Sequence, residues 1–257
     1  MRYEIRAMSF GEILDTGFQL LRNHFTLLVS LSLVIYAPVA VLSLLVGGLQ
    51  TDAISPGVVL LTGIPIALTL LVIAPMVGAA ITFALGKLYL GEEVTFGAAM
   101  GEALSLTVPL VGTSFLSTLA TGLGFALLVV PGVYLLLSFI LLWQVMVMER
   151  IFGMAALKRS HELMKGNRMR ALGVLFIGGI LVIVLSTGLQ MIFSLLPLIG
   201  PLASAVAQAI GSVYTTAISV VLYFDIRCRK EAFDLDHLAS LVRGRSVPPP
   251  LPVAPAQ

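Results

Sequence analysis

The sequence predicts an all-α, polytopic membrane protein with six transmembrane helices in three hairpins, each preceded by a short interfacial amphipathic helix. Three observations predict this class. Hydrophobic residues make up 58% of the 257-residue chain and charged residues only 11%, whereas a soluble domain carries roughly 25% charged residues. The mean hydropathy is +1.05. All fifteen Lys and Arg residues fall into four groups that long apolar runs separate.

The apolar runs define the expected spans, because a helix needs about 20 apolar residues to cross the hydrocarbon core. They lie near residues 26–49, 57–86, 105–130, 132–149, 171–196 and 202–226. The second run contains Pro65 and Pro75 and is longer than a straight span, which a tilt or a proline kink can accommodate. Dividing it would leave the first three cations opposite the other twelve, whereas six spans place all fifteen together.

The placement of the cations predicts the topology. The groups are Arg2, Arg6 and Arg22; Lys87; six cations from Arg150 to Arg170; and five from Arg227 to Arg245. Cytoplasmic loops are the ones enriched in Lys and Arg, so all four groups and both termini are expected in the cytoplasm. The outer connections are then short turns near 51–56, Pro131-Gly132 and 196–201. Residues 1–245 form one membrane domain, and the Pro-rich tail 246–257 is expected to be disordered.

Three shorter segments precede the predicted hairpins: Ser9–His24, Thr95–Leu104 and Gly153–Asn167. The first begins with a capping-box pair, Ser9 and Glu12. The third carries charged residues on one helical face and smaller or apolar residues on the other. The residues of that second face are Ala156, Leu157, Ser160, Leu163 and Met164.

A Phe-Gly dipeptide occurs three times, at Phe10, Phe96 and Phe152, and each begins one of these segments. The matching positions suggest three repeats of an interfacial helix followed by a helical hairpin. Coincidence in a chain with 24 Gly and 13 Phe is the alternative.

The sequence contains no catalytic or metal-binding motif. It has no P-loop and no HExxH pattern, and His24, His161 and His237 lie in different segments. No ionisable residue lies in the middle of a predicted span, where such a residue would mark a functional site. The single Cys, Cys228, excludes an internal disulfide. We therefore expect no enzymatic activity, no cofactor, no metal and no nucleic-acid partner.

Two sets of residues are candidates for function. The first is a cytosolic interaction face for the anionic leaflet or a protein partner: Lys158, Arg159, His161, Lys165, Arg168 and Arg170. The second is a polar stripe in the last span: Ser204, Gln208, Ser212 and Thr216. The stripe adjoins a row of small residues at four-residue spacing, which is typical of close helix packing. Lining a cavity or a lipid groove is the alternative.

Several motifs resemble those of a family of bacterial integral membrane proteins. Residues 155–167 resemble its "AL-x-x-S-x-x-L-x-x-G" segment, and residues 131–134 resemble the turn before its fourth span. Residues 222–235 resemble its "LYYDLR-x-R-x-E-G-F-D-L" ending, with Ala232 where Gly is usual. The family is named after the membrane domain of glycerophosphoryl diester phosphodiesterases. The resemblance implies a bacterial inner-membrane protein of six spans without phosphodiesterase activity, since that chemistry belongs to a separate barrel domain of roughly 250 residues.

Two functions agree with these observations. The first is a non-enzymatic scaffold or accessory subunit of the inner membrane, with an amphipathic cytosolic face that binds lipid or a partner. The second is a transporter or lipid-handling protein with a cavity between helix hairpins. The interior of the bundle discriminates between them, because only the second requires a cavity.

Overall fold

The computed structural model describes residue 3, residues 5–47, residue 63, residues 69–193, residues 200–233 and residue 235. Every regular element in these ranges is helical, which confirms the predicted all-α class. Among the described helices, four are long and apolar enough to cross a membrane, or five if the bent pair α1–α2 is one span. Six spans are therefore not established. The tail 246–257 and most of the turns predicted near 51–56 and 196–201 lie outside the described residues.

Helices α1 (Phe10–Asn23) and α2 (Phe25–Gly47) meet at an 88° bend. The predicted capping box of α1 is confirmed, because Ser9 and Glu12 each accept a hydrogen bond from the other's backbone N–H. A hydrogen bond from Arg6 and this cap together lower the pKa of Glu12 to about 2. The predicted amphipathic segment and the first span thus both form helices.

The π-helical turn η1 (Thr69–Ile73) leads into α4 (Ala74–Tyr89), which corresponds to the later part of the span predicted at 57–86. Pro75 lies in the first turn of α4. Pro75 directly follows η1, so the wider π-helical turn lies where the proline cannot donate a regular helical hydrogen bond. Pro65 lies outside the described residues.

Helix α5 (Phe96–Leu127) runs without a break through the segment Thr95–Leu104 and most of the span predicted at 105–130. The prediction of a separate second interfacial helix is therefore wrong. Thr95 caps the helix through its hydroxyl. The hydroxyl of Ser105, which a new helix could have used as a cap, instead donates to the Glu102 carbonyl at 2.7 Å.

The prediction of one regular helix at 132–149 differs from the structure, in which three successive helical elements occupy this region. They are α6 (Val129–Ser138), α7 (Leu142–Gln144) and the π-helical turn η2 (Val145–Glu149). The chain reverses at Leu128, which is extended, and not at Pro131-Gly132 as predicted. Pro131 fits within the first turn of α6, which starts after the extended Leu128, because an N–H there has no helical partner to lose.

The remaining helices are α8 (Gly153–Met164), α9 (Arg168–Phe193) and α10 (Gly200–Glu231). The face predicted for α8 is confirmed, since the same five residues are buried. Gly153 begins α8 and Gly166 follows its end, with φ angles of +64° and +85°, values that side-chain-bearing residues rarely adopt. Phe10 and Phe96 begin α1 and α5, and Phe152 directly precedes α8, so each Phe-Gly dipeptide marks the start of a helix.

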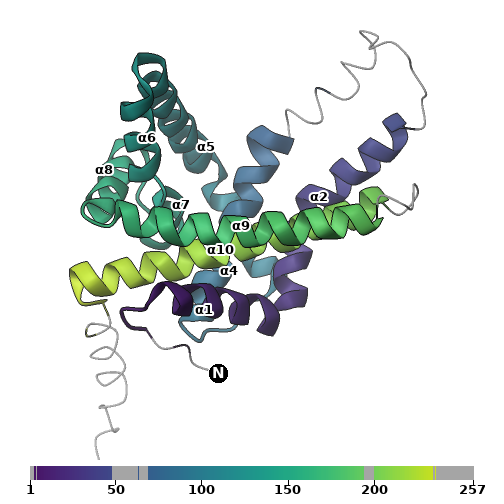
Figure 1. Ribbon diagram of the computed structural model, residues 1–257, viewed down its shortest axis with the longest axis horizontal. Helices are drawn as coiled ribbons and strands as arrows, with labels where there is room; N and C mark the ends of the chain where they lie inside the picture. Colours follow the sequence, from purple (N-terminus) through teal and green to yellow (C-terminus); the bar gives the residue numbers. More distant parts are fainter. Residues whose placement is uncertain are drawn as a thin grey trace, which may run out of the picture.

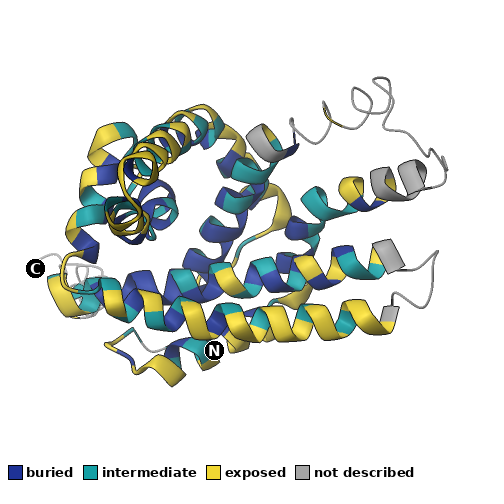
Figure 2. Cartoon of the chain, turned by 45° about the horizontal axis from the view of Figure 1, so that its top comes forward, coloured by how far each residue is buried: buried dark blue, intermediate teal, exposed yellow. Residues whose placement is uncertain are grey.

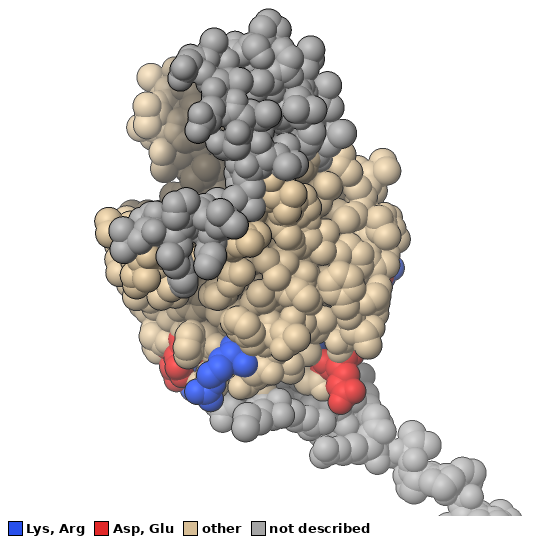
Figure 3. Space-filling view, turned by 90° about the vertical axis from the view of Figure 1, so that its right-hand side faces the viewer, with Lys and Arg blue, Asp and Glu red and all other residues tan. Residues whose placement is uncertain are grey.

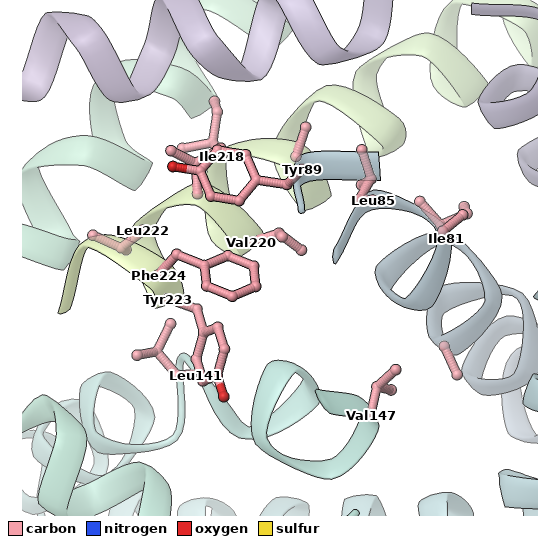
Figure 4. Close-up of a cluster of buried hydrophobic side chains, with 14 of the residues drawn as sticks. Ile81, Leu85, Tyr89, Leu141, Val147, Ile218, Val220, Leu222, Tyr223 and Phe224 are labelled. Carbon is pink, nitrogen blue, oxygen red and sulfur yellow. The ribbon is translucent and has the colours of Figure 1, made fainter. Parts of the chain in front are cut away.

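Helix α10 lies at the centre of the packing. It contacts α2, α9, α1 and α4. Buried residues, dark blue in Figure 2, recur along much of its length. The ring of Phe224 lies 5.0 Å from that of Tyr89 in α4 and 5.2 Å from that of Tyr223, and these residues belong to the apolar cluster in Figure 4. By contrast, α5, α6 and α8 form a lobe beside the end of the molecule where α9 begins and α10 ends (Figure 1).

Charged residues are concentrated on part of the surface. Figure 3 views the end of the molecule where α9 ends and α10 begins, and the described Lys, Arg, Asp and Glu are visible mainly along its lower edge. Apart from a small blue area at the right-hand edge, the rest of the described surface in this view is uncharged. This distribution agrees with apolar helices in contact with a lipid bilayer.

The contact between α5 and α6 provides a test of the hairpin. A Cβ added at Gly124 would lie 3.0 Å from the Cα of Gly132, whereas a Cβ at Gly122 in the same helix would contact nothing within 4 Å. We expect Gly124→Leu to force the helices apart and to destabilise the protein by about 1–3 kcal/mol. Gly122→Leu should be neutral or stabilising because glycine is a poor helix former. Thermal unfolding in detergent micelles measures both, and equal midpoints would contradict the contact.

Candidate functional site

The six residues of the predicted cytosolic face have different environments. Arg159, Arg168 and Arg170 form hydrogen bonds to other helices. Lys158 and Lys165 are exposed and have no carboxylate partner among the described residues. His161 lies between these groups, with Nδ1 3.5 Å from a guanidinium nitrogen of Arg168. The predicted face is therefore partly a set of internal contacts and partly an open surface.

The first internal contact is centred on Asp225 of α10, whose side chain is fully buried. Its carboxylate accepts hydrogen bonds from Arg170 at 2.9 Å, from Arg229 at 3.1 Å and from the backbone N–H of Met8 at 2.7 Å. The same two guanidinium groups donate to the Met8 carbonyl. The segment before α1 is thus joined to α9 and α10 by charge-assisted hydrogen bonds.

The second internal contact joins Glu149 at the end of η2 to α8 and α10. Glu149 accepts two hydrogen bonds from Arg159, the shorter 2.7 Å, and one from the hydroxyl of Tyr223 at 2.8 Å. Arg159 also pairs with Glu231 at 2.6 Å, and Glu231 pairs with Arg227 at 2.8 Å. The hydrogen bond to Glu149 raises the pKa of Arg159 above its ordinary value, so this guanidinium remains charged.

The third contact holds Arg168 against α6. Its guanidinium carbon lies 4.2 Å from the centre of the Tyr134 ring, and it donates to the Tyr134 hydroxyl and to Ser138 Oγ, both at 3.1 Å. Ser160 of α8 donates to the Ser138 carbonyl at 2.9 Å. Because Arg168 can only donate hydrogen bonds, His161 Nδ1 can bond to it only as an acceptor, and the tautomer that does so carries its N–H on Nε2.

An open apolar groove of about 700 Å³ lies between α5 and α8. Its lining is apolar except for two residues of α8, Lys158 and His161. The apolar lining consists of Leu116, Leu119, Ala120, Leu123, Phe139, Met154, Ala155 and Leu157. The volume lies within the range of roughly 300–1,000 Å³ that is typical of ligand sites. The groove thus combines an apolar cleft with a basic rim, which makes it a candidate ligand site.

The polar stripe of α10 includes one clear contact with another helix, at Ser212. The Oγ of Ser212 lies 2.8 Å from the Oγ of Ser32 in α2, and Thr216 donates to a carbonyl of its own helix. Gln208 is exposed and Ser204 is partly buried. A second cavity of about 390 Å³, between α1, α9 and α10, is lined mainly by large apolar residues. Ala207 and Gly211 of the row of small residues border it, but no residue of the polar stripe does.

Sequence reasoning found the cations but missed their partners. Asp225 and Glu149 are adjacent to predicted span ends, where a carboxylate is unremarkable in sequence. One signal was present for Asp225: it precedes Arg229 by four residues, which places the two side chains on one helical face. No comparable signal links Glu149 to Arg159 or to Tyr223, because these contacts arise only from the packing of η2 against α8 and α10.

The geometry does not define a reaction centre. The described carboxylates nearest the groove are bound in ion pairs or exposed, and no group of three or more His, Cys, Asp or Glu among the described residues could hold a metal ion. Comparison with known protein families, curated proteins and solved structures gives no significant match. The class of protein is defined by the fold alone: a helical protein with several candidate membrane spans.

The Asp225 contact predicts a large effect on stability. Asp225→Ala should reduce the free energy of unfolding by about 3–5 kcal/mol, because two guanidinium groups lose a buried partner. The segment before α1 should also become sensitive to proteases. Asp15→Ala is the matched control, since Asp15 is exposed and hydrogen-bonds only within α1, to Gln19. Thermal unfolding and limited proteolysis measure the difference, and similar behaviour of the two variants would contradict the role of Asp225.

The Glu231 contact predicts a dependence on acid. Burial alone would raise the pKa of Glu231, but the hydrogen bonds from Arg159 and Arg227 lower it below the ordinary value of 4.5. This carboxylate therefore stabilises the fold above pH 4.5, and the contribution is lost as the pH falls through the folded-state pKa. We expect the thermal midpoint of Glu231→Gln to change less with pH in this window than that of the wild type. Glu93→Gln, at an exposed carboxylate, should follow the wild type.

Proposed function

We propose that this chain is a non-enzymatic, lipid-binding protein of the bacterial inner membrane, with both termini in the cytoplasm. The groove between α5 and α8 is the observation that carries this proposal. Of the two functions considered from the sequence, lipid handling requires a cavity, and the apolar groove with Lys158 and His161 at its rim supports it. The scaffold hypothesis has weaker support, because three of the five Lys and Arg residues on the predicted face are engaged within the chain.

The proposed ligand is an anionic phospholipid. An acyl chain in the groove gains little free energy over bulk lipid, because lipid tails are as apolar as leucine side chains. Selection must therefore come from the headgroup. The Lys158 ammonium has no carboxylate partner among the described residues, and the Nε2–H of His161 supplies a second donor. A phosphate group at this rim would accept hydrogen bonds from both.

The resemblance to the membrane domain of glycerophosphoryl diester phosphodiesterases is part of this proposal. Its ending motif contains Tyr223, Asp225, Arg227 and Glu231, and each of these residues takes part in an internal contact described above. Such a motif would preserve a fold and not an active site. A shared motif would then imply similar helix packing, with no implied phosphodiesterase activity.

A charge reversal at the rim tests the function. We expect Lys158→Glu to reduce the retention of phosphatidylglycerol about fivefold or more, since one cation near an anionic membrane surface contributes about 1 kcal/mol. The protein would be reconstituted into phosphatidylcholine bilayers with or without added phosphatidylglycerol, delipidated and analysed by native mass spectrometry. Lys165→Glu makes the same charge change on an exposed lysine outside the groove, and it should retain the lipid as the wild type does.

A steric variant separates the groove from the charge. Ala120→Trp fills the groove from α5, so it should lower the retention of phosphatidylglycerol without changing any charge. Ala126→Trp, on an exposed position of the same helix, is its control. Equal losses from Lys158→Glu and Lys165→Glu would indicate a general attraction to the membrane surface and would contradict a defined site. Failure of the wild-type protein to retain phosphatidylglycerol would also contradict a defined lipid site in the groove.

A further inference from the structure

The turn between α5 and α6 has an apolar tip. Leu127, Leu128, Val129 and Val130 are 77%, 69%, 68% and 78% exposed, and no polar side chain interrupts them. Turns that face water are rich in Gly, Asn, Asp and Ser. Four consecutive exposed aliphatic residues therefore suit contact with hydrocarbon better than contact with water.

The returning helix of this hairpin is short. Helix α6 contains 10 residues, which corresponds to a length of about 15 Å at 1.5 Å per residue. The helical path is interrupted at residues 139–141, before α7. A hydrocarbon core is about 30 Å thick, so α6 alone extends through about half of it. The whole returning path, Val129–Glu149, has 21 residues and is long enough to cross, so the position of polar groups along it decides the depth.

The position of Arg168 limits how deeply the tip can reach. Its guanidinium contacts Tyr134 and Ser138. Leu128 precedes Tyr134 by six residues, or about 9 Å along the helix axis. Allowing for the side chains, the guanidinium lies within about 20 Å of the tip. A tip on the far side of the membrane would hold this cation in hydrocarbon without a carboxylate partner among the described residues, which is unfavourable.

Contacts on α5 lead to the same depth. The N–H of Gly153, at the start of α8, donates to Thr113 Oγ1 at 2.8 Å. From Thr113 to the end of α5 at Leu127 there are 14 residues, or about 21 Å. Helix α8, with Lys158 at the groove rim, therefore lies against the half of α5 nearer the tip. Although α5 as a whole is long enough to span a bilayer, its first half is not available for that purpose.

The backbone of the tip is compatible with hydrocarbon. The N–H of Leu128 donates to the Gly124 carbonyl at 3.1 Å, and the Leu128 carbonyl accepts from the N–H of Gly132 at 3.3 Å. Pro131 has no N–H that would need a partner. Backbone groups in a bilayer must be satisfied within the protein, and the reversal at Leu128 meets much of this requirement.

We propose that the α5–α6 hairpin enters one leaflet and returns to the face from which it came, with its tip among the acyl chains. Its binding partner is the hydrocarbon of a single leaflet. The hairpin then contributes no complete crossing, although α5 and Val129–Glu149 are each long and apolar enough for one. The crossings lie in α9, α10 and the segments that contain α2 and the shorter α4. The proposal does not depend on a lipid in the groove, since it follows from the apolar tip and the position of Arg168.

Site-directed labelling tests this topology in the full chain with Cys228→Ser. Ile192→Cys lies near the C-terminal end of α9. Lys165→Cys lies between α8 and α9, near the N-terminal end of α9. A membrane-impermeant maleimide should label these two positions from opposite sides of sealed membranes. Leu128→Cys should be labelled from neither side, although it should react after denaturation. A bimane probe at this position should be quenched by a nitroxide on the acyl chain more strongly than by one on the headgroup.

Labelling of Leu128→Cys from the side that labels Ile192→Cys would show that the hairpin crosses the membrane. Labelling from the side that labels Lys165→Cys would show that the tip is in water. Either result would overturn the proposal. Val130→Cys gives an independent reading at the same tip if Leu128→Cys does not fold. Retention of phosphatidylglycerol by the unlabelled protein is a separate measurement, so failure of the hairpin proposal would leave the groove to be judged by its own variants.

Discussion

The buried carboxylate of Asp225 is the interaction on which the polar end of the molecule depends. It joins the backbone of Met8 to guanidinium groups from α9 and α10, and the same groups satisfy the Met8 carbonyl. Burial of this charge is tolerable because both its partners and its hydrogen bonds are in place. Once the chain before α1 is held here, α1 lies against α10 closely enough for Gly17 to contact Ile218. The position of α1 therefore follows from one polar contact and one missing side chain.

Internal pairing also separates cations that serve the fold from those that can serve binding. Arg159, Arg168 and Arg170 are near Lys158 in sequence, but each is directed toward another helix. Arginine suits these positions because its planar group donates several hydrogen bonds at once. Lys158 and Lys165 are left exposed, and only Lys158 borders an apolar groove. Proximity in the sequence therefore did not predict a shared role.

Much of the fold could be predicted from local patterns. The buried face of α8, the capping box at Ser9 and the extent of α2 and α10 follow from periodicity, caps and apolar length. The break at 139–141 and the reversal at Leu128 could not be predicted in this way. Residues 132–149 are mostly apolar, with only Ser138, Gln144 and the terminal Glu149 as clearly polar residues, so composition alone predicts one continuous span there. The division depends on the packing of α6 and η2 against α8, which no local pattern encodes.

The placement of Lys and Arg along the sequence is also unable to distinguish two topologies. A hairpin that crosses the membrane twice and a hairpin that enters and returns both leave their flanking segments on the same side. The fifteen cations therefore agree equally well with six spans and with four spans plus a hairpin in one leaflet. Three-dimensional contacts discriminate between these topologies because they relate a charge to a depth. Arg168, held on Tyr134 a short distance from the tip, must remain near the polar surface, and this requirement keeps the hairpin in the same leaflet.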